Sequence, residues 1–109
     1  MKYTVVITDP ARDQLLANSR WWAENRSTEQ AVRWYDGFHR SLESLADSPQ
    51  KHRLARENDQ FADELRESYF GLSRRTHRAV FRIDGDIVRV LAVRHLAQDD
   101  LRPDDVEQD

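Results

Sequence analysis

Seven arginines and His95, all within residues 66–95, are the side chains of this sequence best suited to chemistry. A guanidinium group can hold a phosphate or a carboxylate through two parallel hydrogen bonds. A histidine such as His95 can donate or accept a proton near neutral pH. The segment has a net charge of +4, and no lysine follows Lys51 in the chain. These residue types favour contact with a polyanion, with a carboxylate-bearing partner, or with both.

The spacing of these arginines predicts that several share one face of a β-hairpin. Asp84-Gly85 stands between two alternating apolar runs, which is a strong hairpin signal. A turn at these two residues places Phe81 opposite Val88 and makes one face apolar. A four-residue turn would move these pairings. With the two-residue turn, the other face carries three arginines among aliphatic side chains: Arg78, Arg82 and Arg89.

The rest of the chain predicts the elements that position this hairpin. A strand at 2–7 leads into Asp9-Pro10, which suit the start of a helix. That helix ends near 25–26, and Ser27 with Gln30 resembles a capping box for a second helix that stops at 48–49. The apolar helical stripes comprise Ala11, Leu15 and Trp22, then Ala31, Tyr35, Phe38, Leu42 and Leu45. Three strands are expected at roughly 64–70, 75–83 and 86–94.

This order of elements predicts an α+β fold, β-α-α-β-β-β, with a mostly antiparallel sheet and a helical hairpin packed on one face. Trp21 and Trp34 lie off the helical stripes, so they are expected to cap the helix layer or to form an exposed anchor. The domain is expected to span residues 1–97. Residues 98–109 carry six acidic side chains and one basic one, a net charge of −5, and are expected to form an acidic C-terminal tail.

Composition excludes several functional classes. The chain has no cysteine, so it has no disulfide framework or thiolate chemistry, and the cytoplasm is the expected compartment. The four histidines show no metal-ligand spacing, and no phosphate-binding loop is present, so no metal or cofactor is expected. The apolar runs are too short to span a bilayer, and no membrane contact is expected.

Several short motifs together resemble the RelE/ParE superfamily of toxins from bacterial type II toxin–antitoxin systems. The sequence LESLADSP, at residues 42–49, stands at the end of the second helix before a polar loop. The remaining matches lie in the three C-terminal strands: Glu64-Leu65-Arg66, Gly71, His77-Arg78, Phe81-Arg82 and Arg94-His95. The resemblance implies a growth-inhibiting protein that is neutralised by a cognate antitoxin. It also implies that operator DNA is contacted only through the antitoxin.

The resemblance leaves two activities open. RelE-like toxins cleave mRNA on the ribosome without a metal, whereas ParE-like toxins block DNA gyrase by protein–protein binding. We slightly prefer the RelE-like activity from the sequence. Lys51 is the only lysine in the central loop, and the tail has neither tyrosine nor lysine, which favours the ParE-like alternative. A third possibility is a degenerate toxin that binds its antitoxin but has lost activity.

On the RelE-like hypothesis, the resemblance gives individual residues a role. Arg78 would stabilise the reacting phosphate, and His95 would act as an acid if the last strand ends or bulges near it. Without such a bulge, His95 would face the other side of the sheet. The acidic tail is expected to shield part of this surface. The residues expected to bind RNA or another target are Arg74, Arg75, Arg82, Arg89 and Arg94.

Overall fold

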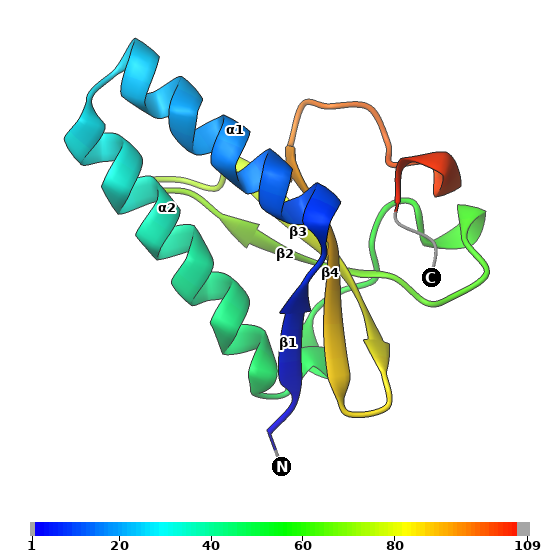
Figure 1. Ribbon diagram of the computed structural model, residues 1–109. Helices are drawn as coiled ribbons and strands as arrows, with labels where there is room; N and C mark the ends of the chain where they lie inside the picture. The colour runs from blue at the N-terminus through cyan, green and yellow to red at the C-terminus, as the bar shows by residue number, and fades with distance from the viewer. Residues whose placement is uncertain (1, 107–109) are drawn as a thin grey trace.

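The computed structural model describes residues 2–106 and contains two helices and a four-stranded sheet (Figure 1). The elements are β1 (Thr4–Ile7), α1 (Asp9–Asn25), α2 (Thr28–Glu43), β2 (Arg66–Phe70), β3 (His77–Asp84) and β4 (Ile87–His95). The strands are ordered β1-β4-β3-β2, with β1 parallel to β4 and the other neighbours antiparallel. The predicted α+β fold and its β-α-α-β-β-β order are confirmed.

Local sequence signals explain where the helices begin. Ser27 precedes α2, and its hydroxyl accepts a hydrogen bond from the Gln30 N–H at 3.0 Å, as the capping motif predicts. The N-cap of α1 is Thr8 rather than Asp9, which lies inside the first turn with Pro10. Thr8 does not cap the helix through its side chain; its hydroxyl donates to the Val90 carbonyl oxygen at 2.8 Å and ties the helix start to β4.

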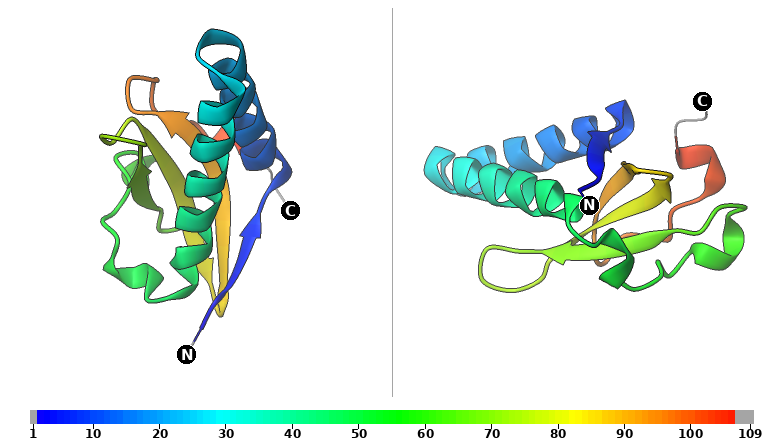
Figure 2. Two further views of the ribbon diagram at one scale, coloured as in Figure 1. Left: turned by 90° about the vertical axis from the view of Figure 1, so that its left-hand side faces the viewer. Right: turned by 90° about the horizontal axis from the view of Figure 1, so that it is seen from below.

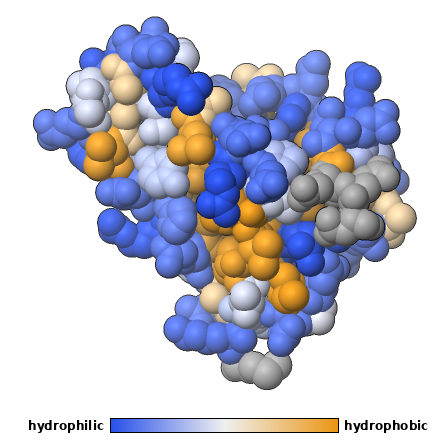
Figure 3. Space-filling model, in the orientation of Figure 1, coloured by the Kyte–Doolittle hydropathy of each residue, from blue (hydrophilic) through white to orange (hydrophobic). Residues whose placement is uncertain are grey.

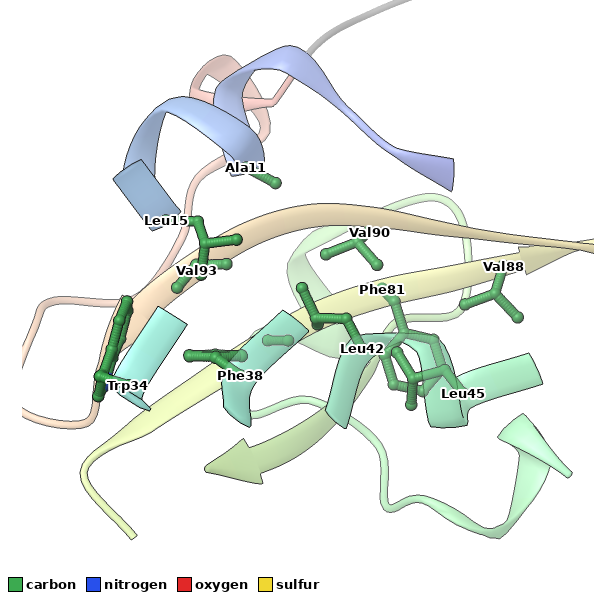
Figure 4. Packing of buried hydrophobic residues seen from close by; sticks show 11 residues of the cluster. Ala11, Leu15, Trp34, Phe38, Leu42, Leu45, Phe81, Val88, Val90 and Val93 are labelled. Carbon is green, nitrogen blue, oxygen red and sulfur yellow. The ribbon is translucent and has the colours of Figure 1, made fainter. Parts of the chain in front are cut away.

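Both helices cover one face of the sheet, which we call the helix face (Figure 2). Figure 4 shows side chains of α1 and α2 directed toward those of β3 and β4. Trp34 belongs to this core and is fully buried, so it packs within the helix layer and does not form the exposed anchor that the sequence left open. It stands one helical turn before Phe38 and extends the same stripe. The core cluster comprises Ala11, Leu15, Trp34, Phe38, Leu42, Leu45, Ala79, Phe81, Val88, Val90 and Val93.

The opposite face, which we call the outer face, is also covered. A second apolar cluster packs there, formed by the loop before β2, the strands and the C-terminal segment 98–106: Ala55, Leu65, Val80, Leu91, Ala92 and Leu101. In Figure 1 the C-terminal segment lies beside the loop that precedes β2. Leu101 is fully buried and Val106 packs against the same cluster, so the described part of the predicted acidic tail is anchored to the outer face. Residues 107–109 of the predicted tail lie outside the described residues.

The hairpin differs in register from the simplest prediction. Asp84 pairs with Ile87, so Gly85 and Asp86 form the turn, with Gly85 at a φ of +59°. Phe81 faces Val90 instead of Val88. A shift of two residues preserves which side chains share a face, because alternate residues of a strand point the same way. The predicted grouping of the arginines on one face is therefore confirmed although the pairings changed.

Candidate functional site

Arg78, predicted to stabilise a phosphate, is fully buried in an ion-pair cluster on the outer face. Its Nη1 donates to Glu57 Oε1 at 2.8 Å and to Glu67 Oε1 at 3.0 Å, and its Nη2 donates to Glu57 Oε2. The exposed fractions of the two glutamates are 0% and 3%. Two carboxylates therefore surround one guanidinium, and the charge of the arginine is fully matched within the protein.

The C-terminal segment covers this ion-pair cluster on the side that would otherwise face solvent. The backbone N–H of Leu101 donates to Glu57 Oε2 at 2.7 Å, and the Leu101 side chain is buried beside the cluster. Burial by itself would raise the pKa of Glu57, but the hydrogen bonds from Arg78 and Leu101 hold that pKa below its ordinary value. The prediction that Arg78 lies on an open surface is wrong, because a guanidinium enclosed in this way cannot reach a substrate phosphate.

The other predicted arginines are dispersed over the molecule. At the hairpin turn, Arg82 Nε and Arg89 Nε lie 2.9 and 3.3 Å from Asp84 Oδ2. Arg75 stacks over the ring of Tyr69, with 5.2 Å between its guanidinium carbon and the ring centroid. Arg94 Nη2 donates to the Asp99 carbonyl oxygen at 2.7 Å. Their suggested contacts with a target stay predictions, and the structure does not gather them into one site.

A β-bulge brings the last predicted residue, His95, into a different neighbourhood. Phe81 pairs with Val90, but the preceding residue of β3 pairs with Ala92, which leaves Leu91 as an extra residue in β4. Beyond this extra residue, the side chains of β4 change faces. His95 therefore lies on the helix face, where it is the cross-strand neighbour of His77. Their ring centroids are 5.1 Å apart. The last strand does bulge, as the sequence required for His95, but the bulge turns His95 away from Arg78, so these two predicted residues do not share one site.

His77 and His95 lie at the base of a pocket of about 530 Å³. The pocket forms where the C-terminal half of α1 meets the turn between β2 and β3. A Cβ atom at Gly71 would lie 1.5 Å from the Arg74 carbonyl oxygen, so this tight turn requires glycine at that position. The lining residues are Asn18, Trp21, Trp22, Arg26, Leu72, Ser73, Arg74, Thr76, His77 and His95.

Burial keeps His77 neutral, and two hydrogen bonds fix its tautomer. Its Nε2 lies 3.0 Å from Asn18 Oδ1, and its Nδ1 lies 2.8 Å from the Thr76 hydroxyl. The amide oxygen can only accept, so His77 Nε2 carries the proton and Nδ1 accepts one from Thr76. Burial, and then the nearby His95, lower the pKa of His77 to about 4. His77 is therefore an uncharged, fixed part of the pocket at neutral pH.

His95 is exposed and oriented differently. Its Nδ1 accepts a hydrogen bond from the Ala97 N–H at 3.0 Å, and its own backbone N–H donates to Gln98 Oε1 at 2.7 Å. The neutral ring therefore carries its proton on Nε2, which has no hydrogen-bond partner among residues 2–106. This arrangement leaves one polar atom of His95 available to a ligand.

A groove between the two helices is the second hollow in the surface. Its lining is mainly apolar, and it includes Leu16 and Val32, which are 43% and 53% exposed. Figure 3 shows further apolar surface over β1 and the adjoining part of β4. Within residues 2–106, no group of three or more acidic or histidine side chains could hold a metal ion. No helix in that range is long and apolar enough to cross a bilayer.

Comparison with known proteins identifies the family. Residues 5–100 match the model of the ParE toxin of the type II toxin–antitoxin system parDE. The chain belongs to this ParE toxin family. No curated protein sequence matches it. The predicted resemblance to the RelE/ParE superfamily is confirmed, and the protein is the toxin component of a type II toxin–antitoxin module whose partner is a cognate antitoxin.

Two solved structures share the fold of this ParE-family toxin. The chromosomal ParDE toxin–antitoxin system from P. aeruginosa is 17% identical with a TM-score of 0.69, covering 86% of this chain and 96% of that chain. A doubly substituted arginine-to-alanine mutant of the E. coli toxin RelE, in the free state, is 18% identical with a TM-score of 0.54, covering 89% and 86%. The fold is therefore common to both branches of the superfamily, and it does not separate their mechanisms.

The toxin's pocket contains two residues that the sequence had selected, Arg74 and His95, and several that it had not. Asn18 and Trp22 are four residues apart on one side of α1, and Arg26 follows four residues later as the residue that ends this helix. That spacing was a usable signal, but it does not reveal which segment faces this side. The contact with the β2–β3 turn arises only when the helix packs on the sheet.

Proposed function

We propose that this toxin inhibits growth by binding DNA gyrase in the ParE manner, without cleaving RNA. The burial of Arg78 carries the proposal. RNA cleavage without a metal needs a cation at the reacting phosphate, and the arginine at the position expected for that role is enclosed by Glu57 and Glu67. Both carboxylates already hold this guanidinium, so the cluster has no free cation to offer a phosphate.

The family match supports the same choice. The ParE toxin model covers residues 5–100, which include both helices and all four strands. The sequence slightly favoured RelE-like mRNA cleavage, and the structure shifts our preference to the alternative. A ParE-like toxin requires a protein-binding surface and no reactive group, which agrees with a chain whose predicted catalytic arginine is structural.

The test is a DNA gyrase supercoiling assay with the purified toxin. We expect inhibition that increases with toxin concentration and disappears when the cognate antitoxin is added in equal amount. Cell-free translation with ribosomes, followed by primer extension on the mRNA, should show intact message in parallel. Normal supercoiling together with ribosome-dependent cleavage would reject the proposal. Normal supercoiling together with intact mRNA would instead favour the degenerate toxin that only binds its antitoxin.

RelE-like cleavage is the second candidate, and one observation favours it. The bulge at Leu91 places His95 in a pocket with Arg74, so a potential acid and a cation lie together even though Arg78 is withdrawn. On this hypothesis, His95→Ala and Arg74→Ala would each abolish cleavage in the translation assay. Arg33→Ala is the matched control, because Arg33 is an exposed arginine of α2 outside the pocket lining.

For the antitoxin, we propose docking of an amphipathic helix along the groove between α1 and α2. Exposed Leu16 and Val32 supply the apolar contact that such a helix requires. Val32→Glu should lower the affinity for the antitoxin by at least about tenfold, since it would bury an unpaired charge at the interface. Arg33→Glu, at an exposed neighbour outside the groove lining, is the control. Unchanged affinity of Val32→Glu would place the antitoxin elsewhere.

A further inference from the structure

The pocket between α1 and the β2–β3 turn has the size and the walls of a small-molecule site. Its volume of about 530 Å³ lies within the range of roughly 300–1,000 Å³ that is usual for ligand clefts. Three separate segments of the chain contribute to it. They are the C-terminal part of α1 with Arg26, the β2–β3 turn with the first residue of β3, and the last residue of β4. Sites of this kind are held in shape by the packing of the elements around them.

Two cations at this pocket lack partners. The side chains of Arg26 and Arg74 are exposed, and neither makes a hydrogen bond or an ion pair among residues 2–106. No acidic residue lines the pocket. Arg78 and Arg82, by contrast, are paired with carboxylates. The pocket is therefore a positively charged hollow on a protein whose net charge is −3, and an anion would be attracted to it.

The polar atoms inside the pocket are mostly fixed donors and acceptors. Neutral His77 is held between Asn18 and Thr76, so it adds no charge and does not move. His95 Nε2 has no partner among the described residues and can donate to a ligand. A directed donor that shares a pocket with two arginines is well suited to a phosphate, which offers several acceptor oxygens at once.

An aromatic wall completes the site. Trp21 is 50% exposed, and its ring meets that of Trp22 edge to face, with centroids 5.6 Å apart. Edge-on packing against Trp22 steadies Trp21 and leaves surface on which a planar ring can stack. Stacking on exposed tryptophan beside arginine is a common way for proteins to hold a nucleobase.

We propose that this pocket binds a nucleotide unit, with the base stacked on Trp21 and the phosphate held by Arg26, Arg74 and His95. The unit can come from a free mononucleotide or from the phosphorylated end of a single-stranded nucleic acid, which present the same base and phosphate. The inference concerns binding alone and does not depend on whether the toxin acts on gyrase or on the ribosome. Its failure would leave the proposed function untouched.

The test is calorimetric titration of the full-length toxin with three probes: adenosine 5′-monophosphate, adenosine and inorganic phosphate. We expect saturable binding of the monophosphate and at least about tenfold weaker binding of each part, because the base and the phosphate contact different walls. Equal affinity for phosphate and for the monophosphate would overturn the stacking contact. Absence of saturable monophosphate binding would overturn the proposal as a whole.

Matched variants separate this site from general charge attraction. Arg74→Ala and Arg26→Ala should each weaken monophosphate binding by about tenfold, the usual effect of losing a hydrogen bond to a charged group. Arg20→Ala and Arg33→Ala remove the same charge from exposed positions of α1 and α2 outside the pocket lining, and should bind normally. Equal losses in all four variants would mean nonspecific attraction and would reject the site.

Two further experiments test the stacking of the base on Trp21 and the source of the nucleotide. Trp21→Ala should weaken binding of the monophosphate without affecting that of inorganic phosphate, whereas Leu16→Ala, exposed on α1 outside the pocket, should change neither. A short single-stranded oligonucleotide is then tested with and without a 5′-phosphate. Tighter binding of the phosphorylated strand than of the monophosphate would assign the site to nucleic-acid ends, and the reverse order would assign it to free nucleotides. Preference for an acidic peptide over the monophosphate would overturn the proposal in favour of a protein partner.

Discussion

The outer face around Arg78 and the pocket around His77 and His95 differ in whether their charged side chains are paired within the protein. Both lie on β3, with Arg78 next to His77 in sequence and on the opposite side of the sheet. Around Arg78 every charge has a partner and the cluster is closed by Leu101. At the pocket, Arg26 and Arg74 have no side-chain partner within the part of the chain that the structure describes, and the hollow is open to solvent.

This contrast shows why a count of arginines is a poor guide to a binding surface. An arginine is available to a ligand only when no carboxylate of its own protein satisfies it. Arg78 stands in the most arginine-rich part of the chain, yet it serves the stability of the fold. At the pocket, the available cations are Arg74, in the turn, and Arg26, which lies far from the hairpin in sequence.

Replacing Arg78 should have the largest effect and would test the closed side of the comparison. Arg78→Met leaves Glu57 and Glu67 buried without a cation, which should lower the free energy of unfolding by about 3–5 kcal/mol. Urea denaturation followed by circular dichroism measures this loss. Arg75→Ala, at an exposed position, should change stability by no more than about 0.5 kcal/mol. A fully stable Arg78→Met would mean that the cluster is not closed in solution.

The neutral His77 at the pocket should make the protein less stable in acid. The pKa of His77 is about 4 when folded and 6.5 for the free side chain. Between these values the unfolded chain binds a proton that the folded chain excludes, so stability falls as the pH decreases from about 6.5 to about 4. The loss should approach about 3 kcal/mol. Above pH 6.5, His77 is neutral in both the folded and the unfolded chain and no longer lowers the free energy of unfolding.

The control for this pH dependence is His77→Gln. Urea midpoints compared at several pH values should fall less steeply for the variant over the same interval. The other titrating groups are common to both chains, so the difference belongs to His77. Equal slopes for the two proteins would contradict a buried neutral imidazole, and they would remove the contrast in charge between the two regions.

Shortening Leu101 should loosen the cover of the Arg78 cluster. Leu101→Ala removes buried methyl groups from the outer-face cluster and should destabilise the protein by about 2–3 kcal/mol, near the lower end for a buried leucine. Hydrogen exchange should then speed up at the Leu101 amide, which donates to Glu57. Asp100→Ala, at an exposed neighbour, should have almost no effect. A stability loss as small as that of Asp100→Ala would show that the C-terminal segment does not pack on the sheet in solution.

The smallest effect is expected inside the pocket. Thr76→Val removes the hydroxyl that donates to His77 Nδ1 and should cost about 1 kcal/mol, the usual net value of one hydrogen bond. The nitrogen chemical shifts of the His77 ring would report the loss of its fixed tautomer. Thr28→Val, at an exposed position of α2, is the matched control. Unchanged ring shifts would mean that Asn18 alone fixes the imidazole.

Periodicity and turn chemistry predicted much of the fold but stopped short of the site. The order of elements, the Ser27 cap and the grouping of arginines on one face all follow from local patterns. The turn is displaced by one residue because glycine takes the first turn position, where a positive φ is needed. The bulge at Leu91 has no local signal in the sequence, and His95 could be placed only by knowing about it.

The amino-acid sequence by itself determined that this chain forms a β-α-α-β-β-β toxin fold, because hydrophobic periodicity and capping act between near neighbours. Only the tertiary structure decided which charged groups are paired. Glu57 reaches Arg78 from a loop 21 residues away, and Leu101 seals the pair from the far end of the chain. Electrostatic partners act through space, so whether an arginine supports the fold or remains open to a ligand is settled only by packing.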